Sequence, residues 1–370
     1  MSILKKAKIN KVSMDLSNYY YLIQGVQKSG KTTFARDFIL EMCNGNPEEG
    51  LLLAIGKEKG YKALDDINAL DIETWKDFED VIKELVETKK EHGIKYIFID
   101  TYDELIPLAE KEIIKMSIKA TKKPCKTFNS AFGGYGQPRI ELRKLVTAKL
   151  ELLNKHFGLF VLGHTKLKTI KEQGALEEQE YQKLSSNLNA DYHNIVAHKA
   201  DVIGTVVVEK EISEKRLSET KTMIYFRDNG FIEAGSRFKN IVDKTEFNAK
   251  NFISTIKDAI KNSSKTKVTD EEMDAIAKKE KAMREKSLEQ QKVTQQEQEE
   301  DEVVEQVQDD EETKRATNKE LFDKIRPLYT SADKVKKIRI KEILKEYGQA
   351  KFDLNAPSEM FEEVLDLLEN

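Results

Sequence analysis

Short apolar runs alternate with longer stretches of helical periodicity over about the first 260 residues of the chain. Such runs are typical of strands buried on both faces of a sheet, and the helices between them are long enough to return the chain to the next parallel strand. The pattern predicts an α/β fold with a mostly parallel sheet. The last two runs have no helix between them, which predicts an antiparallel hairpin. The expected strands are Tyr19–Gln24, Leu51–Ile55, Lys95–Asp100, Leu159–His164, Val202–Glu209 and Thr222–Arg227.

Residues 261–318 have a different character. They contain almost no core-forming pattern, and EQEEDEVVEQVQDDEE is nearly all acidic. Like charges repel and little apolar surface is available for burial, so we expect a charged linker that is disordered or transiently helical. A short coiled coil is the alternative, although no heptad persists. The acidic tract is interpreted as a solubilising tether, or else as a mimic of nucleic-acid charge.

Helical periodicity returns in ELFDKIRPLY, DKVKKIRIKEILKEYG and SEMFEEVLDLLE. Tyr347-Gly348 is typical of a helix C-cap, and Asn355-Ala356-Pro357-Ser358 is typical of a helix start. We expect three domains or segments: a large α/β domain over residues 1–260, the linker over 261–318, and a small helical module over 319–370. A module of this size is marginally stable alone or is stabilised by a partner.

A phosphate-binding motif lies between the first strand and the first long helix. The segment GVQKSGKT fits G-x-x-x-x-G-K-S/T in full. Gly25 and Gly30 allow backbone N–H groups to turn toward phosphate oxygens, and the helix N-terminus adds a partial positive charge. Lys31 is expected to reach the β and γ phosphates, and the Thr32 hydroxyl to bind Mg²⁺. The expected nucleotide-binding residues are Gly25, Val26, Gln27, Lys28, Ser29, Gly30, Lys31, Thr32 and Thr33.

Polar residues follow three of the other expected strands. Asp100 ends the strand KYIFID and is the expected second Mg²⁺ ligand; the alternative is that it caps the following helix. Glu58 comes just after Leu51–Ile55 and is the candidate base for the attacking water, unless it belongs to a solvated turn. His164 ends LFVLGH, where a polar side chain would sense the γ phosphate. The predicted catalytic residues are therefore Lys31, Glu58, Asp100 and His164.

The ordered set GVQKSGKTT, GKEKGYKAL, YIFIDTYDEL, LFVLGHTKLK, KADVIGTVVVE and FRDNGFIEAGSRF resembles the phage-encoded RecA-like single-strand-annealing ATPases, the Sak-four group. The resemblance spans about Tyr19–Phe238. It implies a RecA-like P-loop NTPase core, binding of single-stranded DNA, annealing or strand exchange, and action beside a phage single-strand-binding protein. It also implies the phosphate and Mg²⁺ roles of Lys31, Thr32 and Asp100, a water-activating role for Glu58 and a sensor role for His164. The acidic linker and the helical module lie outside it.

The resemblance further implies that the loops after Asp100 and His164 bind DNA. The first loop interleaves basic with aromatic residues, which suits sequence-tolerant single-strand binding, and the second is a long polar segment that begins with lysines. An ordinary solvated lysine-rich loop is the alternative. The candidate DNA-binding residues are Lys122, Lys123, Lys126, Phe128, Phe132, Tyr135, Arg139, Lys166 and Lys168.

Two arginines near the end of the α/β domain are candidates for action on a neighbouring subunit. In ring or filament ATPases a neighbour supplies a cation to the γ phosphate, and Arg227 or Arg237 would serve here in a homo-oligomer. Both are equally suited to surface ion pairs.

The overall composition sets the remaining expectations. The net charge is only −4, and no apolar run is long enough to span a membrane. The first residues carry charges instead of a secretory signal, so we expect a cytoplasmic protein, in a bacterial host if it is phage-encoded. The leading hypothesis is an ATPase that uses ATP and Mg²⁺ and is stimulated by single-stranded DNA. The alternatives are an ATP-dependent switch that docks a replication or packaging partner, and a small-molecule kinase.

Overall fold

The computed structural model describes residues 9–57, 59–171, 180–213, 216–264 and 267–369. The chain divides into two compact units, Met1–Met283 and Arg284–Asn370. Each unit is described by itself.

The larger unit is built around a ten-stranded sheet in the order β10-β8-β7-β1-β5-β4-β2-β3, with β6 paired to β5 and β9 paired to β7. All pairings from β7 through β1, β5, β4 and β2 to β3 are parallel. The predicted α/β fold with a mostly parallel sheet is therefore confirmed. The strands are β1 Tyr20–Gly25, β2 Gly50–Ile55, β3 Ala69–Ile72, β4 Tyr96–Asp100, β5 Gly158–Lys171, β6 Glu180–Ser186, β7 Val202–Ser213, β8 Arg216–Tyr225, β9 Gly235–Ser236 and β10 Lys244–Glu246.

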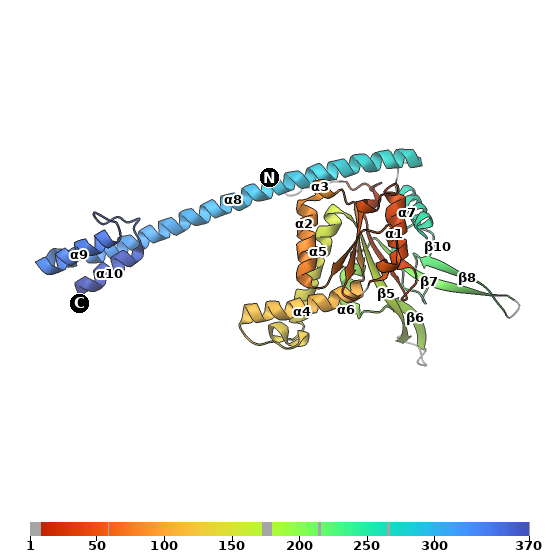
Figure 1. Ribbon diagram of the computed structural model, residues 1–370, viewed down its shortest axis with the longest axis horizontal. Coiled ribbons are helices and arrows are strands. Elements are labelled where there is room, and N and C mark those ends of the chain that lie inside the picture. Colours follow the sequence, from red (N-terminus) through yellow and green to blue (C-terminus); the bar gives the residue numbers. More distant parts are fainter. Residues whose placement is uncertain (1–8, 58, 172–179, 214–215, 265–266, 370) are drawn as a thin grey trace. The chain divides into compact units, whose positions relative to one another are not determined.

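Helices cover both faces of the sheet (Figure 1). One apolar cluster joins the sheet to α2, α4, α5 and α6, and a second joins the opposite face to α1, α7 and the start of α8. In β1, Tyr20 and Leu22 belong to the first cluster and Tyr21 and Ile23 to the second, as the two-residue period of a strand requires. The helices of this unit are α1 Lys31–Met42, α2 Trp75–Glu87, α3 Lys89–His92, α4 Tyr102–Thr121, α5 Gln137–His156, α6 Ala190–Ala197 and α7 Ala249–Ser263.

An aromatic stack fixes α1 on the sheet. Tyr21, Phe160 and Phe98 are register partners on β1, β5 and β4. Their rings stack at centroid distances of 4.4 Å for Tyr21–Phe160 and 4.5 Å for Phe98–Phe160. Phe38 of α1 packs on the central ring at 4.6 Å. Because all four side chains are fully buried, they hold the start of α1 in a defined place at the end of β1.

The predicted antiparallel hairpin is confirmed, since β7 and β8 pair antiparallel from Thr205–Tyr225 onward. The expectation of a long loop after His164 is wrong for the described residues. There β5 continues past the parallel sheet to Lys171 and pairs antiparallel with β6, and α6 follows. Exposure alternates along this ribbon, since Lys168, Ile170 and Tyr181 are each half-buried between exposed neighbours, as the two-residue period of a strand requires.

Helix α8 runs from Asp270 to Ser331, over most of the segment that we expected to be a linker, and the boundary between the two units falls within it. Its sequence is rich in Glu, Gln and Lys, which lose little side-chain freedom in a helix.

The smaller unit packs the end of α8 against α9 Lys334–Glu346 and α10 Ser358–Glu369. The Asn318 amide donates to the carbonyls of Leu354 and Ala356, both at 2.8 Å, and so ties the loop before α10 to α8. Gly348 adopts a φ of 70° just after α9, and α10 begins at Ser358, as the sequence predicts.

Candidate functional site

The loop between β1 and α1 has the geometry of a phosphate cradle. A side chain at Gly25 would place its Cβ 2.8 Å from Ser29 Oγ and 3.1 Å from the Val206 carbonyl oxygen, so a larger residue there would force Ser29 and β7 to shift. Gly30 adopts a left-handed φ of 89° as the N-cap residue of α1, and no side chain caps the helix there. The first N–H groups of α1 are therefore available to an anion.

Lys31 lies folded into this loop. It is 5% exposed, and its ammonium group donates to the carbonyls of Gly25 at 3.0 Å and Val26 at 2.9 Å. A buried ammonium needs oxygen partners, and the loop supplies them from its own backbone. The charge is thereby held at the centre of the cradle.

The Thr32 hydroxyl donates to Asp100 Oδ2 at 2.8 Å. Asp100 is buried at the end of β4, with 5% of its surface exposed, and the N-cap position of α4 belongs to Thr101 instead. The helix-capping alternative for Asp100 is therefore not favoured. The hydroxyl of Thr101 is also buried, and it has no hydrogen-bond partner among the residues that the structure describes.

Hydroxyl and carboxylate oxygens are the ligands that Mg²⁺ takes from proteins, alongside phosphate oxygens and water. The pair of Thr32 and Asp100 beside the cradle thus fits a magnesium ion carried by a nucleotide.

His164 lies next to the cradle, because it is the register partner of Gly25 on the adjacent strand. Asp103, in the first turn of α4, accepts from the His164 backbone N–H at 2.8 Å, and His164 Nδ1 lies 3.8 Å from the same oxygen. Asn187 donates its backbone N–H to the His164 carbonyl at 2.7 Å, and its amide lies 3.4 Å from Asp103 Oδ1. Sequence reasoning missed Asn187, which is one of several polar residues in a row and is distinguished only by its place after β6.

Glu58 lies outside the described residues, so its position is not part of the site geometry. Its neighbour Lys59 pairs with Asp71 at 2.5 Å on the edge strand β3. A second carboxylate, which sequence reasoning did not single out, lies at the end of β2: Glu104 of α4 faces Gly56 so closely that a Cβ there would be 2.9 Å from Glu104 Oε2.

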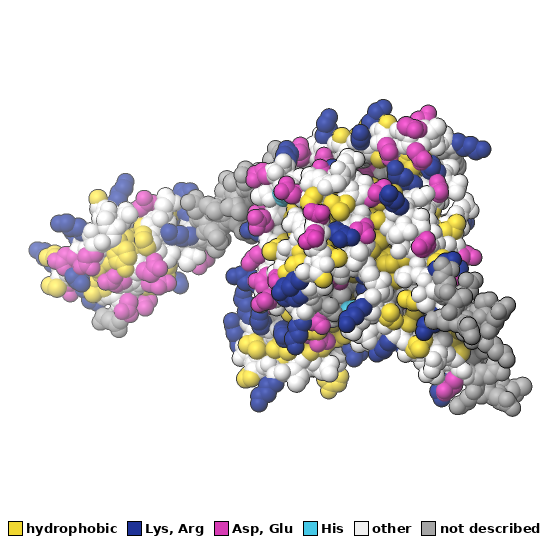
Figure 2. Space-filling model, turned by 45° about the vertical axis from the view of Figure 1, so that its right-hand side comes forward, with side chains coloured by type: hydrophobic (Ala, Val, Ile, Leu, Met, Phe, Trp, Pro, Cys, Tyr) yellow, Lys and Arg dark blue, Asp and Glu magenta, His cyan; other side chains and the backbone are white. Residues whose placement is uncertain are grey.

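The candidate DNA-binding residues after α4 fall into two groups. Lys122, Lys123 and Lys126 are exposed, and Tyr135 is fully exposed on a backbone with a φ of 50°. In the other group, the side chains contact the rest of the domain. Phe128 and Phe132 are half-buried against the core, and a guanidinium nitrogen of Arg139 lies 3.3 Å from a carboxylate oxygen of Asp191. Figure 2 shows Lys and Arg side chains together with hydrophobic ones on the lower part of the larger unit, the level at which α4 lies in Figure 1.

On the β5–β6 ribbon, Lys166 is exposed, whereas Lys168 is half-buried and donates to the Leu188 carbonyl at 2.8 Å. Burial, together with the nearby charge of Lys166, lowers the pKa of Lys168 despite the opposing effect of Glu233. Lys168 therefore holds the ribbon to the segment before α6, while Lys166 remains accessible.

Both candidate trans-acting arginines are engaged within their own chain. Arg227 donates to the carbonyls of Phe238 at 2.6 Å and Lys239 at 2.5 Å. Arg237 donates to Asp201 at 3.0 Å and to the His198 carbonyl at 2.9 Å. These contacts favour the alternative of a structural role for each guanidinium.

A polar network that sequence reasoning missed joins β1 to the ribbon. Gln24, buried on β1, donates to Thr205 Oγ1 at 3.1 Å and to the Glu233 carbonyl at 3.2 Å. The Glu233 carboxylate accepts from the Ser186 backbone N–H at 3.2 Å and lies 3.1 Å from His193 Nε2. Burial acts to raise the pKa of Glu233, but the hydrogen bond and charge of His193 outweigh it, so this pKa is lowered from its ordinary value.

A glycine-rich cradle at a helix start, a buried lysine within it and a hydroxyl–carboxylate pair at the end of a neighbouring strand define a P-loop nucleotide-binding site. The sheet around it, mostly parallel with helices on both faces, is consistent with a RecA-like P-loop NTPase core. The family model described as "AAA domain" matches residues 17–251, and the chain belongs to this family. It is therefore a P-loop ATPase domain followed by a small C-terminal unit, and α8 runs from the one into the other.

Two other comparisons concern curated proteins and solved structures. No curated protein matches the chain. Among solved structures, the KaiC-like protein PH0186 from the hyperthermophilic archaeon Pyrococcus horikoshii OT3 is similar at 15% sequence identity and a TM-score of 0.29, over 62% of this chain and 89% of that one. In addition, no helix among the described residues is both long and apolar enough to cross a membrane.

Proposed function

We propose that this protein hydrolyses ATP with Mg²⁺, binds single-stranded DNA and promotes annealing or strand exchange, as a phage recombination protein of the Sak-four type. The observation that carries the ATPase part is the contact between Thr32 and Asp100 beside the buried ammonium of Lys31. Bound Mg²⁺ would neutralise charge on the β and γ phosphates.

Each residue of the site has a defined part in this proposal. The N–H groups of the loop and the Lys31 ammonium bind the phosphates; the ammonium exchanges its bonds with the Gly25 and Val26 carbonyls for phosphate oxygens. The oxygens of Thr32 and Asp100 hold the metal ion. Glu58 orients and deprotonates the attacking water, and His164 responds to the γ phosphate.

The DNA-binding part is supported by the surface after α4. Exposed lysines attract the phosphate backbone, and the open ring of Tyr135 offers a face on which a base stacks. The ribbon that carries Lys166 begins directly after His164, so a change at the γ phosphate would reach it through Asn187 and the first residues of the ribbon. The protein in this proposal forms a homo-oligomer, acts beside a single-strand-binding protein and works in the cytoplasm of a bacterial host.

The experiment is the steady-state ATPase rate with and without an oligonucleotide of single-stranded DNA. We expect stimulation by DNA and loss of hydrolysis in Lys31→Ala, with Lys76→Ala, an exposed lysine on α2, as the control. An ATPase rate that does not change when DNA is added, together with tight binding of a protein partner, would favour the alternative of an ATP-dependent docking switch. No hydrolysis at all by the unaltered protein would overturn both the enzyme and the recombination proposals.

A further inference from the structure

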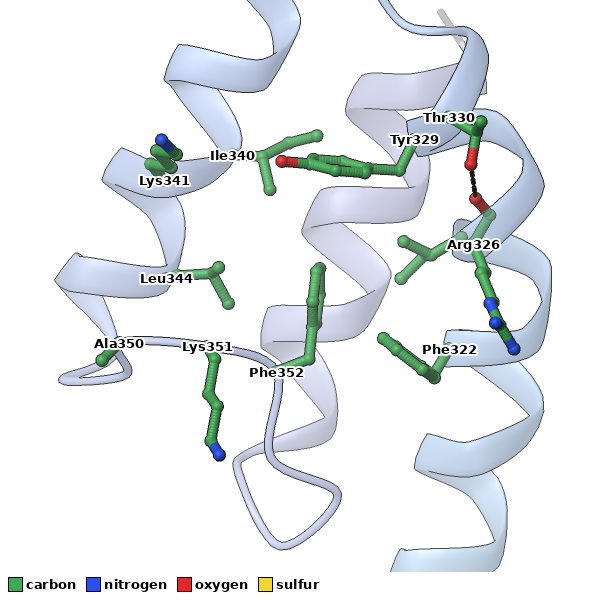
Figure 3. Close-up of a pocket in the computed structure, with 11 residues that line it drawn as sticks. Phe322, Arg326, Tyr329, Thr330, Ile340, Lys341, Leu344, Ala350, Lys351 and Phe352 are labelled. Carbon is green, nitrogen blue, oxygen red and sulfur yellow. Dashed lines mark hydrogen bonds between the residues drawn. The ribbon is translucent and has the colours of Figure 1, made fainter.

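The small C-terminal unit contains a pocket that the ATPase site does not use. It encloses about 350 Å³ between the end of α8, α9 and the loop that follows α9 (Figure 3), which is within the range of sites that bind ligands. Its floor is aliphatic, formed by the buried Ile325, Ile340 and Leu344. Its aromatic residues are half-buried: Phe322, Tyr329 and Phe352.

Three cations surround this apolar interior. Arg326, Lys341 and Lys351 line the pocket and are exposed, and none of them forms an ion pair with any residue in the described part of the chain. Elsewhere on α9 a cation is neutralised, since Arg339 pairs with Glu342 at 3.0 Å and Glu346 at 3.5 Å. The three cations that line the pocket are therefore not neutralised by the described residues and can pair with an anionic partner.

The part of the unit that surrounds the pocket, residues 319–369, is not basic. Residues 319–369 carry ten Lys and Arg against eleven Asp and Glu. A nucleic acid gains affinity from many phosphate contacts spread over a surface, and such a surface would be strongly basic. A concave aliphatic floor with only three cations at its edge fits a smaller target, in which a few negative charges flank one apolar group.

We propose that this pocket binds a short acidic peptide segment of a partner protein, with one bulky apolar side chain inserted into the apolar interior of the pocket, beside the packed rings of Phe322 and Phe352. The peptide carboxylates then pair with Arg326, Lys341 and Lys351, while the inserted side chain covers Ile325 and Leu344. A buried anchor surrounded by charge pairs is the usual composition of a small, energetically dominant contact between proteins. The pocket thus gives the ATPase a tether to an acidic partner.

The test uses the full-length protein and the fluorescein-labelled hexapeptide Glu-Asp-Glu-Phe-Asp-Glu in a fluorescence anisotropy titration. We expect saturable binding that weakens as salt is added, because exposed charge pairs are screened. Replacing the phenylalanine of the peptide by serine should reduce affinity at least tenfold, which tests the apolar interior without changing the protein.

A double charge reversal, Arg326→Glu with Lys351→Glu, should reduce affinity at least tenfold and leave the ATPase rate unchanged. The matched control is Lys324→Glu with Lys345→Glu, which reverses two exposed charges on the same unit outside the pocket and should bind the peptide within about threefold of the unaltered protein. The proposal is overturned if no binding occurs up to about 1 mM peptide, if both double variants lose affinity equally, or if an unlabelled single-stranded oligonucleotide competes as well as the unlabelled peptide.

Discussion

The Thr32 hydroxyl lies 2.8 Å from Asp100 Oδ2, although the two residues are 68 positions apart in the chain. They belong to different parts of the fold, the first turn of α1 and the end of β4. Strand β5 separates β1 from β4 in the sheet, so α1 reaches across β5 to make the contact. The space between the two strand ends is the position that His164 occupies. The insertion of β5 between β1 and β4 thus brings together the nucleotide-binding loop, the expected metal ligand Asp100 and the expected sensor His164.

The first prediction concerns this contact. Thr32→Val keeps the shape of the side chain but removes the hydroxyl, and we expect the ATPase rate to fall on the order of 100-fold, the upper end of the cost of losing a group around a bound metal. Thr32→Ser keeps the hydroxyl and should retain most of the activity. The measurement is the rate as a function of Mg²⁺ concentration. Equal rates for the two variants would show that the hydroxyl holds no metal.

The second prediction concerns Tyr135. Because its ring is fully exposed, Tyr135→Ala removes a stacking face and little else. We expect the affinity for single-stranded DNA to drop by about 1–3 kcal/mol, whereas Tyr135→Phe should retain it. Fluorescence anisotropy with a labelled oligonucleotide gives the two affinities, and thermal melting shows whether the fold is intact. Unchanged binding by Tyr135→Ala would remove this loop from the DNA-binding proposal.

Local patterns predicted the elements that carry the nucleotide site. The P-loop motif and the apolar run that ends in Asp100 were expected as the structure has them. The run that ends in His164 was expected as a strand, although β5 continues to Lys171. Burial on both faces makes such strands visible in sequence, because nearly every position is apolar.

Features that depend on register were not predictable in the same way. Strands β3, β6, β9 and β10 are short or lie at the edges, with polar residues that resemble loops. The half-burial of Phe128 and Phe132 depends on how the segment folds back on α5, which no local spacing encodes. The contact of Glu233 with Ser186 joins residues 47 positions apart and that of Asn187 with Asp103 residues 84 positions apart, so only the assembled sheet reveals them.

The third prediction concerns the pairing of Glu233 with His193. The folded-state pKa of Glu233 is lowered, so its stabilising contribution is fully present above the unfolded value of about 4.3 and is lost as the pH falls through the folded value. Glu233→Gln should reduce the free energy of unfolding at pH 7 by on the order of 1–2 kcal/mol.

The pH series distinguishes this effect from a simple loss of packing. Urea unfolding should show the difference between Glu233→Gln and the unaltered protein shrinking over the acidic range below about pH 4.3. A difference that stays constant over that range would mean that the carboxylate charge contributes nothing.

The fourth prediction concerns which carboxylate acts as the general base for the attacking water. Glu58→Gln should still bind nucleotide but lose about 100-fold in the hydrolysis rate, within the usual contribution of a general base. Glu104→Gln is the matched comparison, because the Glu104 carboxylate lies against Gly56 at the end of β2. It should keep the rate within about threefold, since a carboxylate in the first turn of α4 serves mainly to complement the helix N-terminus. Single-turnover hydrolysis and binding of a fluorescent ATP analogue separate the two steps. Loss of hydrolysis in Glu104→Gln alone would transfer the role of the base from Glu58 to Glu104.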